Sequence, residues 1–230
     1  MSYKLVALDI DGTIRSVERP ITERTRQAIA RVSEAGTVVT LATGRIFQSA
    51  RASSSDLNLK SPIVSFQGAH VAFPCSGEVL WHRPLTRELI AEALDALRGW
   101  DVQTVAYHED QIFVQETTEW VEAYAVRNQV KLNLVDDLTS RDVPEATRLV
   151  AVGDESHIEH LERDMIANFG AGLHVTRSLP RFCEVLHPLA GKHRALDWLC
   201  GWLGIDSAEV VVFGNGYNDV HALQWAGLAV

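Results

Sequence analysis

Two aspartates one residue apart, Asp9 and Asp11, follow a short apolar segment near the start of the chain and lead into a Gly-Thr turn. Alternate side chains of an extended strand point to one face, so we expect both carboxylates on one side of the end of a buried strand. Open α/β sheets bind their ligands at that end of their strands. The alternative interpretation is an acidic turn that caps the following helix.

Two chemical functions suit such a pair of carboxylates. Neighbouring carboxylates repel each other unless a cation lies between them, and Mg2+ prefers oxygen ligands. A carboxylate can also attack phosphorus and form an aspartyl phosphate. The pair therefore indicates a metal-assisted reaction at a phosphate group.

A second β-rich segment, residues 38–42, ends in Thr43, Gly44 and Arg45. The glycine lets backbone amides approach a ligand, the hydroxyl group is a donor, and the guanidinium group can bind an oxyanion with two parallel hydrogen bonds. This loop suits a phosphate group. Alternatively, Thr43 only caps the helix that follows.

Near the other end of the chain, a third strand-like segment, residues 209–213, runs into a glycine-rich loop with Asn215, Asn218 and Asp219. Their side chains again place oxygen ligands at the end of a strand. Upstream, Lys192 begins a segment with helical apolar spacing. A lysine at that position is also typical of a solvated surface, but the four sites together favour one functional centre.

The four motifs, DxDGT, an apolar run before TGR, a lysine that heads a helix, and GxGxND, occur in an order that resembles the haloacid dehalogenase-like superfamily, with the spacing of its Cof-type sugar-phosphatase branch. The resemblance covers nearly the whole chain. It implies that Asp9 is the nucleophile and Asp11 the general acid/base. It further implies a phosphate site formed by Thr43, Gly44, Arg45, Lys192 and Asn218, and a Mg2+ site formed by Asp9, Asp11, Asn215 and Asp219.

Two positions depart from the pattern of this family. The last motif usually begins Gly-Asp, whereas this chain has Asn215, whose neutral amide attracts a cation less strongly than a carboxylate does. The family also often has Asn-Gly-Ala after the strand that follows TGR, whereas this chain has Gln67-Gly68-Ala69. The first departure puts the metal affinity in question, and the second predicts altered contacts near the pocket.

The elements that must position these residues follow from periodicity. A helix over 21–32 between two strands predicts a β-α-β unit with parallel strands, which a helix over 46–53 and a strand over 63–66 extend. From Leu85 onward, short strands joined by tight turns predict an antiparallel sheet backed by helices. With the resemblance, we expect an α/β fold in which residues 1–84 and 187–230 form a Rossmann-like core with a parallel sheet, and residues 85–186 form an inserted α+β cap.

Composition narrows the functional class. The chain has 230 residues, 47% of them hydrophobic, and a formal net charge of -9, which disfavours a binder of nucleic acid or of acidic membranes. It contains no apolar stretch of membrane-spanning length, and its three widely spaced cysteines are typical of reduced, packed thiols. We expect a cytoplasmic location. Residues 227–230 resemble the start of another strand, which indicates either a trimmed chain or a naturally short family member.

We therefore predict a Mg2+-dependent phosphatase that hydrolyses a small phosphorylated metabolite, such as a sugar phosphate, through an aspartyl phosphate. The alternative prediction is a catalytically impaired module that binds a phosphometabolite. The sequence identifies neither the substrate nor the oligomeric state. Candidate residues for recognition of the leaving group lie in the expected cap and include Tyr107, His108, Trp120, Arg127 and Arg181.

Overall fold

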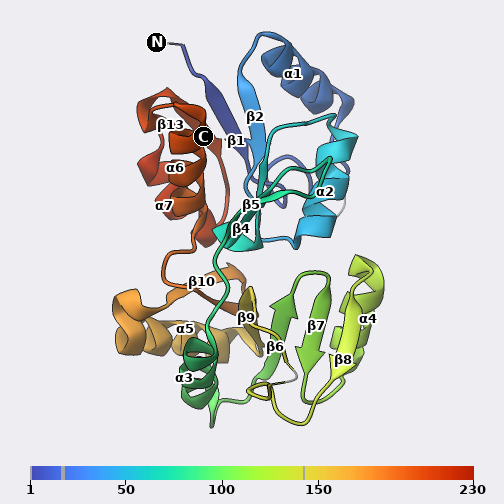
Figure 1. The fold of residues 1–230 in the computed structure, drawn as a ribbon, viewed down its shortest axis with the longest axis vertical. Coiled ribbons are helices and arrows are strands. Elements are labelled where there is room, and N and C mark those ends of the chain that lie inside the picture. The colour runs from blue at the N-terminus through green and yellow to red at the C-terminus, as the bar shows by residue number, and fades with distance from the viewer. Residues whose placement is uncertain (1, 17–18, 142) are drawn as a thin grey trace. The chain divides into compact units, whose positions relative to one another are not determined.

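The computed structural model describes residues 2–16, 19–141 and 143–230. It divides the chain into two compact units, of which the first contains Met1–His82 and Ala190–Val230 and the second contains Arg83–Leu189. The second unit therefore lies, in the sequence, between the two segments of the first (Figure 1).

The first unit is built on a parallel sheet with the strand order β13-β12-β1-β2. Its strands are rich in valine and leucine and are mostly buried, as expected of a sheet that is covered on both faces. The bounds of the strands are Leu5–Leu8 for β1, Val38–Leu41 for β2, Val210–Phe213 for β12 and Leu228–Ala229 for β13.

Helices cover both faces of this sheet (Figure 1). Leu5 and Ala7 pack with α6 and α7 on one face, whereas Leu8 and Leu41 pack with α1 and α2 on the other. Thr22 caps α1, since its side chain accepts a hydrogen bond from the backbone N–H of Thr25. The bounds of the helices are Glu23–Glu34 for α1, Phe47–Asp56 for α2, Lys192–Leu203 for α6 and Val220–Trp225 for α7.

The strand predicted over 63–66 is present, but among the residues described it continues the parallel sheet through one bridge only and forms its ladder elsewhere. β3 (Ile63–Ser65) belongs to a separate antiparallel sheet with β4 (His70–Ala72) and β5 (Val79–His82), neither of which the periodicity analysis identified. Only an isolated parallel bridge, between Ala42 and Val64, links β3 to the end of β2 in the described part of the chain. β3 thus follows the end of β2 through this bridge and forms its antiparallel ladder with β4.

The second unit is a sheet with the strand order β10-β11-β9-β6-β7-β8. Its pairs are antiparallel as expected, with the exception of β7 and β8, which are parallel because helix α4 connects them. The strands are β6 (Gln103–His108), β7 (Gln111–Val114), β8 (Lys131–Leu134), β9 (Arg148–Val152), β10 (His174–Leu179) and β11 (Phe182–Leu186). The helices are α3 (Arg87–Leu97), α4 (Glu119–Asn128) and α5 (Glu155–Phe169).

One face of the second sheet packs an apolar core against α3 and α5, whereas the other buries a charged pair. Arg148 of β9 donates to Glu184 of β11 at 2.5 Å, and its guanidinium carbon lies 4.4 Å from the ring centre of Tyr107. The side chains of Arg148 and Glu184 are 6% and 3% exposed. Tyr107 is itself buried beneath α4, so it is not an accessible contact for a leaving group.

The buried pair generates a prediction about stability. Glu184→Gln leaves the Arg148 charge buried without its carboxylate, so we expect the free energy of unfolding to fall by about 3–5 kcal/mol. Asp154→Asn removes the partner of Arg181 in an exposed pair and is expected to cost less than about 1 kcal/mol. Urea denaturation of both variants measures the difference, and equal losses would contradict this role of the buried pair.

Candidate active site

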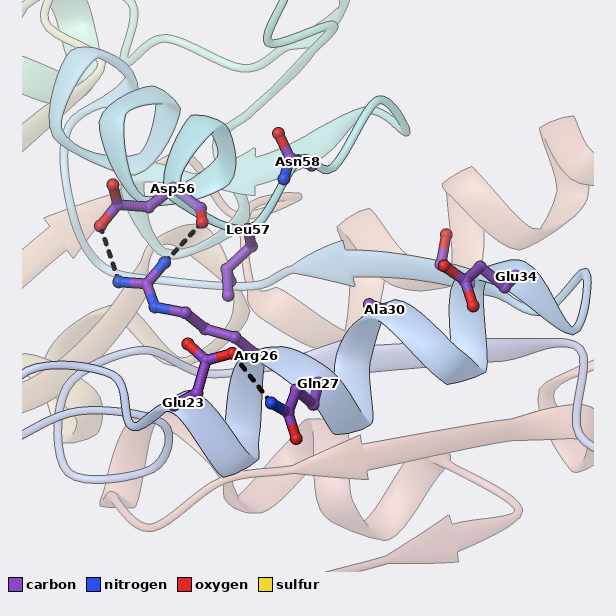
Figure 2. Close-up of a pocket in the computed structure, with 9 residues that line it drawn as sticks. Glu23, Arg26, Gln27, Ala30, Glu34, Asp56, Leu57 and Asn58 are labelled. Atoms are coloured by element: carbon purple, nitrogen blue, oxygen red, sulfur yellow. Dashed lines mark hydrogen bonds and ion pairs between the residues drawn. The ribbon is translucent and has the colours of Figure 1, made fainter.

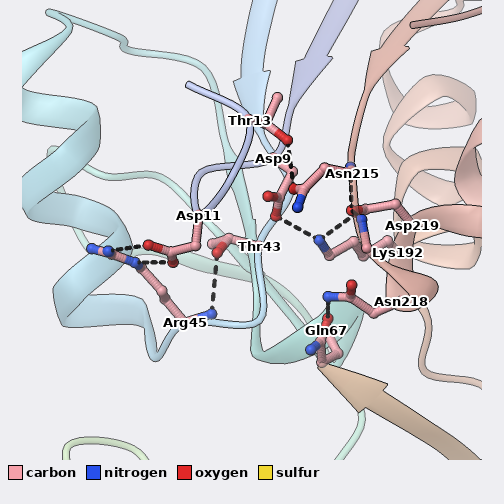
Figure 3. Close-up of polar contacts among 11 residues, drawn as sticks. Asp9, Asp11, Thr13, Thr43, Arg45, Gln67, Lys192, Asn215, Asn218 and Asp219 are labelled. Carbon is pink, nitrogen blue, oxygen red and sulfur yellow. Dashed lines mark hydrogen bonds and ion pairs between the residues drawn. The ribbon is translucent and has the colours of Figure 1, made fainter. Parts of the chain in front are cut away.

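The two aspartates after β1 form ion pairs with different basic side chains. Asp9 is 6% exposed, and its Oδ1 accepts a hydrogen bond of 2.7 Å from the Nζ of Lys192. The side chain of Asp11 is 56% exposed and forms an ion pair with Arg45. Figure 3 shows the two carboxylates turned toward these separate partners. The two aspartates therefore lie in very different environments, although they are one residue apart.

Lys192 is the first residue of α6 and is buried. Its ammonium group donates to Asp9 at 2.7 Å and to Oδ1 of Asp219 at 2.6 Å. Burial alone would lower the pKa of Lys192, but the two carboxylates outweigh burial and raise it. Burial raises the pKa of Asp9, and Lys192 partly offsets this rise. The ammonium group therefore stays charged and links the end of β1 to the loop after β12.

Asp219 organises the loop that follows β12. Its Oδ2 accepts hydrogen bonds from the backbone N–H groups of Asn215 and Gly216, at 3.1 and 3.0 Å. A Cβ atom at position 214 would lie only 2.6 Å from the Cβ of Asp219, so this position requires glycine. Both oxygens of Asp219 thus take part in hydrogen bonds, one with the buried lysine and the other with the loop.

Asn215 connects the same loop to the turn after β1. Its Oδ1 accepts a hydrogen bond of 2.9 Å from the hydroxyl group of Thr13. Gly12 has a φ of +91°, and a Cβ atom there would overlap the amide of Asn215. The turn thus needs glycine both for its backbone conformation and for this close approach.

The loop after β2 is held through backbone and side-chain groups. Thr43 is buried, and its hydroxyl oxygen accepts a hydrogen bond of 3.2 Å from the backbone N–H of Arg45. The Nε and a terminal nitrogen of Arg45 donate to the two oxygens of Asp11 at 2.6 and 2.7 Å. The guanidinium group that we expected to bind an oxyanion therefore contacts a carboxylate of the chain.

Gln67 is a member of this cluster that the sequence analysis noted as a departure but did not include among the site residues. It is 1% exposed, and its Oε1 accepts a hydrogen bond of 3.0 Å from the side-chain amide of Asn218. A Cβ atom at Gly44 would overlap its amide nitrogen. Gln67 therefore joins the loop after β2 to the loop after β12, and its departure from the Asn-Gly-Ala pattern was the signal for these contacts.

All the residues that the sequence analysis assigned to the site lie at the carboxyl ends of β1, β2 and β12 or at the start of α6 (Figure 3). Two carboxylates contact the buried ammonium group of Lys192, and hydroxyl and amide side chains lie at the same strand ends. In the described residues, no group of three or more histidine, cysteine, aspartate or glutamate side chains is arranged to hold a metal ion. A cation here would thus have to combine carboxylate oxygens with amide, backbone or water oxygens.

A separate surface groove of about 430 Å³ runs beside α1, where Arg26 is paired with Asp56 (Figure 2). A second hollow, of about 580 Å³, lies where β2 begins and shares Ser33, Glu34 and Asn58 with the first. Neither is lined by a residue of the predicted site, because the site lies at the opposite end of β2.

The first unit has a parallel sheet with two aspartates after its first strand. A buried lysine connects the first of these aspartates to Asp219, in a loop that is distant in the sequence. This arrangement is typical of a hydrolase of the haloacid dehalogenase-like class. The model of the haloacid dehalogenase-like hydrolase family matches residues 6–230. The chain belongs to this family. The predicted fold class, a parallel-sheet α/β core with an additional sheet-containing unit, is confirmed.

Several known proteins resemble this chain over nearly its full length. The HMP-PP phosphatase of Cronobacter sakazakii is 28% identical over 231 residues, which cover 97% of this chain and 82% of that protein. The 5-amino-6-(5-phospho-D-ribitylamino)uracil phosphatase of Bacillus subtilis is 25% identical over 242 residues, covering 98% of this chain and 85% of that protein. The prediction of an enzyme of the haloacid dehalogenase-like phosphatase class is confirmed.

Solved structures resemble the fold equally well. A haloacid dehalogenase-like hydrolase from Bacteroides thetaiotaomicron is 26% identical with a TM-score of 0.81, covering 99% of this chain and 88% of that one. A protein of Streptococcus mutans is 19% identical and shares the fold with a TM-score of 0.87. The match covers 99% of this chain and 86% of that chain.

Among the described residues, no helix has the length and apolar character needed to cross a membrane.

The packing of Gly68 generates a prediction about the site. Gly68 has a φ of +93°, and a Cβ atom there would overlap the carbonyl oxygen of Gly191 and lie 2.8 Å from the backbone nitrogen of Lys192. Gly68→Ala must therefore displace the start of α6 and lower both stability and any activity that depends on Lys192.

Gly77→Ala is the matched control, because Gly77 has a φ of +77° and a Cβ atom there would meet no atom of the described residues within 4 Å. It should cost only the backbone strain, about 1–3 kcal/mol. The loss of stability of each variant is measured by thermal and urea unfolding. The difference between the two losses separates the cost of steric overlap from the cost of backbone strain. If Gly68→Ala loses no more stability than Gly77→Ala, the close approach does not constrain α6.

Proposed function

We propose that the protein is a Mg2+-dependent phosphatase that hydrolyses small phosphomonoesters, such as sugar phosphates, through a phosphoaspartate on Asp9. The observation that carries this proposal is the buried Asp9 carboxylate held by Lys192 at 2.7 Å, beside a second, exposed aspartate with a different partner. Environments that differ in this way are typical of carboxylates with two distinct catalytic roles. The names of two relatives, which are phosphatases for small phosphorylated molecules, support the substrate class.

In the first step, an oxygen of Asp9 attacks phosphorus, and the bond between phosphorus and the ester oxygen breaks. Asp11 gives a proton to the departing alkoxide. Thr43, the amide of Gly44, Lys192 and Asn218 would contact the oxygens of the transferring phosphoryl group. Lys192 keeps Asp9 in place and balances its charge, because the same ammonium group is fixed by Asp219 at 2.6 Å.

In the second step, Asp11 removes a proton from a water molecule, whose oxygen attacks phosphorus. The bond between phosphorus and Asp9 breaks, inorganic phosphate leaves, and the carboxylate is restored. The inserted unit, Arg83–Leu189, is proposed to act as a cap that selects the leaving group, because the residues assigned to phosphate chemistry belong to the first unit.

The oxygen donors of the site fit Mg2+. Asp9, Asn215 and Asp219 place hard oxygen ligands at adjoining strand ends, and the backbone carbonyl group of Asp11 would add a further one. When bound, Mg2+ would withdraw negative charge from the phosphoryl oxygens. Two carboxylates and one ammonium group leave the buried cluster with a formal charge of -1, which favours a cation.

Asp9→Asn tests the assigned nucleophile. The amide has nearly the same shape but cannot attack phosphorus, so we expect loss of at least about 99% of the turnover of p-nitrophenyl phosphate while the fold is kept. The assay is run with and without Mg2+, together with circular dichroism. Turnover above a few per cent would remove Asp9 from this role, and a wild-type protein that binds phosphate esters without turnover would instead indicate a binding module.

Asn215→Asp tests the metal site. An added carboxylate beside the cation should lower the Mg2+ concentration for half-maximal activity by about tenfold, an interaction of roughly 1–2 kcal/mol in a partly solvated site. Asn58→Asp adds the same charge at an exposed position beside the groove of Figure 2 and should leave the requirement unchanged. Titration calorimetry with Mg2+ checks the affinity directly. An unchanged or raised requirement in Asn215→Asp would mean that position 215 does not face the metal.

A further inference from the structure

Arg45 was expected to bind the phosphate of the substrate, but its contacts indicate a different role. Its guanidinium group donates two near-parallel hydrogen bonds to Asp11, with Nε at 2.6 Å and a terminal nitrogen at 2.7 Å. This geometry fixes both oxygens of a carboxylate at once, which a single ammonium group cannot do. The two donors of the Arg45 guanidinium group are therefore engaged by Asp11 of the same chain.

The position of Arg45 is itself fixed by its backbone. Its N–H donates to the hydroxyl oxygen of Thr43 at 3.2 Å, and its carbonyl oxygen accepts from the N–H of Phe66 at 2.8 Å. The side chain of Arg45 is 24% exposed, whereas that of Asp11 is 56% exposed. A half-solvated aspartate on a turn gains a defined orientation from a better anchored arginine.

We propose that Arg45 is a positioning residue for the general base, holding the carboxyl group of Asp11 in the orientation in which it activates water in the second step. This inference rests on the proposed function. Two donors of one guanidinium group fix both oxygens of Asp11 and so set the direction in which this carboxyl group faces a water molecule. With an ester whose leaving group departs without a proton, Asp11 acts only in the second step. Hydrolysis of the phosphoaspartate should thus depend on Arg45 more than its formation does.

Pre-steady-state kinetics with p-nitrophenyl phosphate separates the two steps, because its leaving group departs without a proton from Asp11. In Arg45→Met we expect a burst of p-nitrophenolate that approaches one equivalent per protein, followed by a steady state slowed about 10- to 100-fold. Acid quenching should trap the accumulated phosphoenzyme. Arg45→Lys keeps the charge but not the two parallel donors, so its steady-state rate should lie between those of Arg45→Met and the wild type.

Two further variants define the outcome. In the double variant Asp11→Asn with Arg45→Met, the phosphoenzyme should decay no more slowly than in Asp11→Asn alone, because the arginine acts through Asp11. Arg51→Met changes an α2 arginine that contacts the backbone of Cys75 and should behave like the wild type. Circular dichroism verifies folding of each variant.

The results distinguish failure of this inference from failure of the proposed function. If Arg45→Met and Arg45→Lys show a raised KM, a slower first step and no burst, while the wild type still passes through a phosphoenzyme, Arg45 is a phosphate ligand and the inference is wrong. If no variant, the wild type included, forms a phosphoenzyme, the proposed mechanism fails and the inference fails with it.

Discussion

The site depends on one buried ammonium group shared by two carboxylates. Lys192 stands in the first turn of α6, where the helix dipole disfavours a cation, and it is almost fully removed from water. Its charge is tolerable only because Asp9 and Asp219 both lie within hydrogen-bonding distance. The end of β1, the loop after β12 and the start of α6 must therefore meet at one point, and the glycines that pack against these segments follow from that requirement.

This constraint also separates the two aspartates after β1. Because Asp9 accepts a hydrogen bond from Lys192, its carboxylate is held in a buried site and keeps one orientation. Asp11 lies outside that cluster, in a more solvated place, and its partner is Arg45. A single strand end thus supplies one buried carboxylate and one solvated carboxylate, a difference that the local surroundings impose on two identical side chains.

The sequence predicted the elements that carry the motifs, because buried parallel strands and capped helices have strong periodic signals. It predicted the convergence of Asp9, Thr43, Lys192 and Asp219 because carboxyl ends of parallel strands share one edge of a sheet. It did not predict β4 or β5, which are short, nor the parallel pairing of β7 with β8, which a helical connection determines. The pairing of Arg45 with Asp11 depends on side-chain orientation across two loops, which spacing does not encode.

Asn215 shows how a departure from a family pattern can have a local structural logic. Its amide oxygen accepts a hydrogen bond from Thr13 at 2.9 Å, so the turn after β1 and the loop after β12 stay joined through neutral groups. A carboxylate at this position would join Asp9 and Asp219 in a cluster that contains a single buried ammonium group, and mutual repulsion would destabilise the metal-free site. The amide avoids that repulsion, because it carries no charge. The amide at position 215 therefore joins the turn after β1 to the loop after β12 without adding a third carboxylate beside the single buried ammonium group.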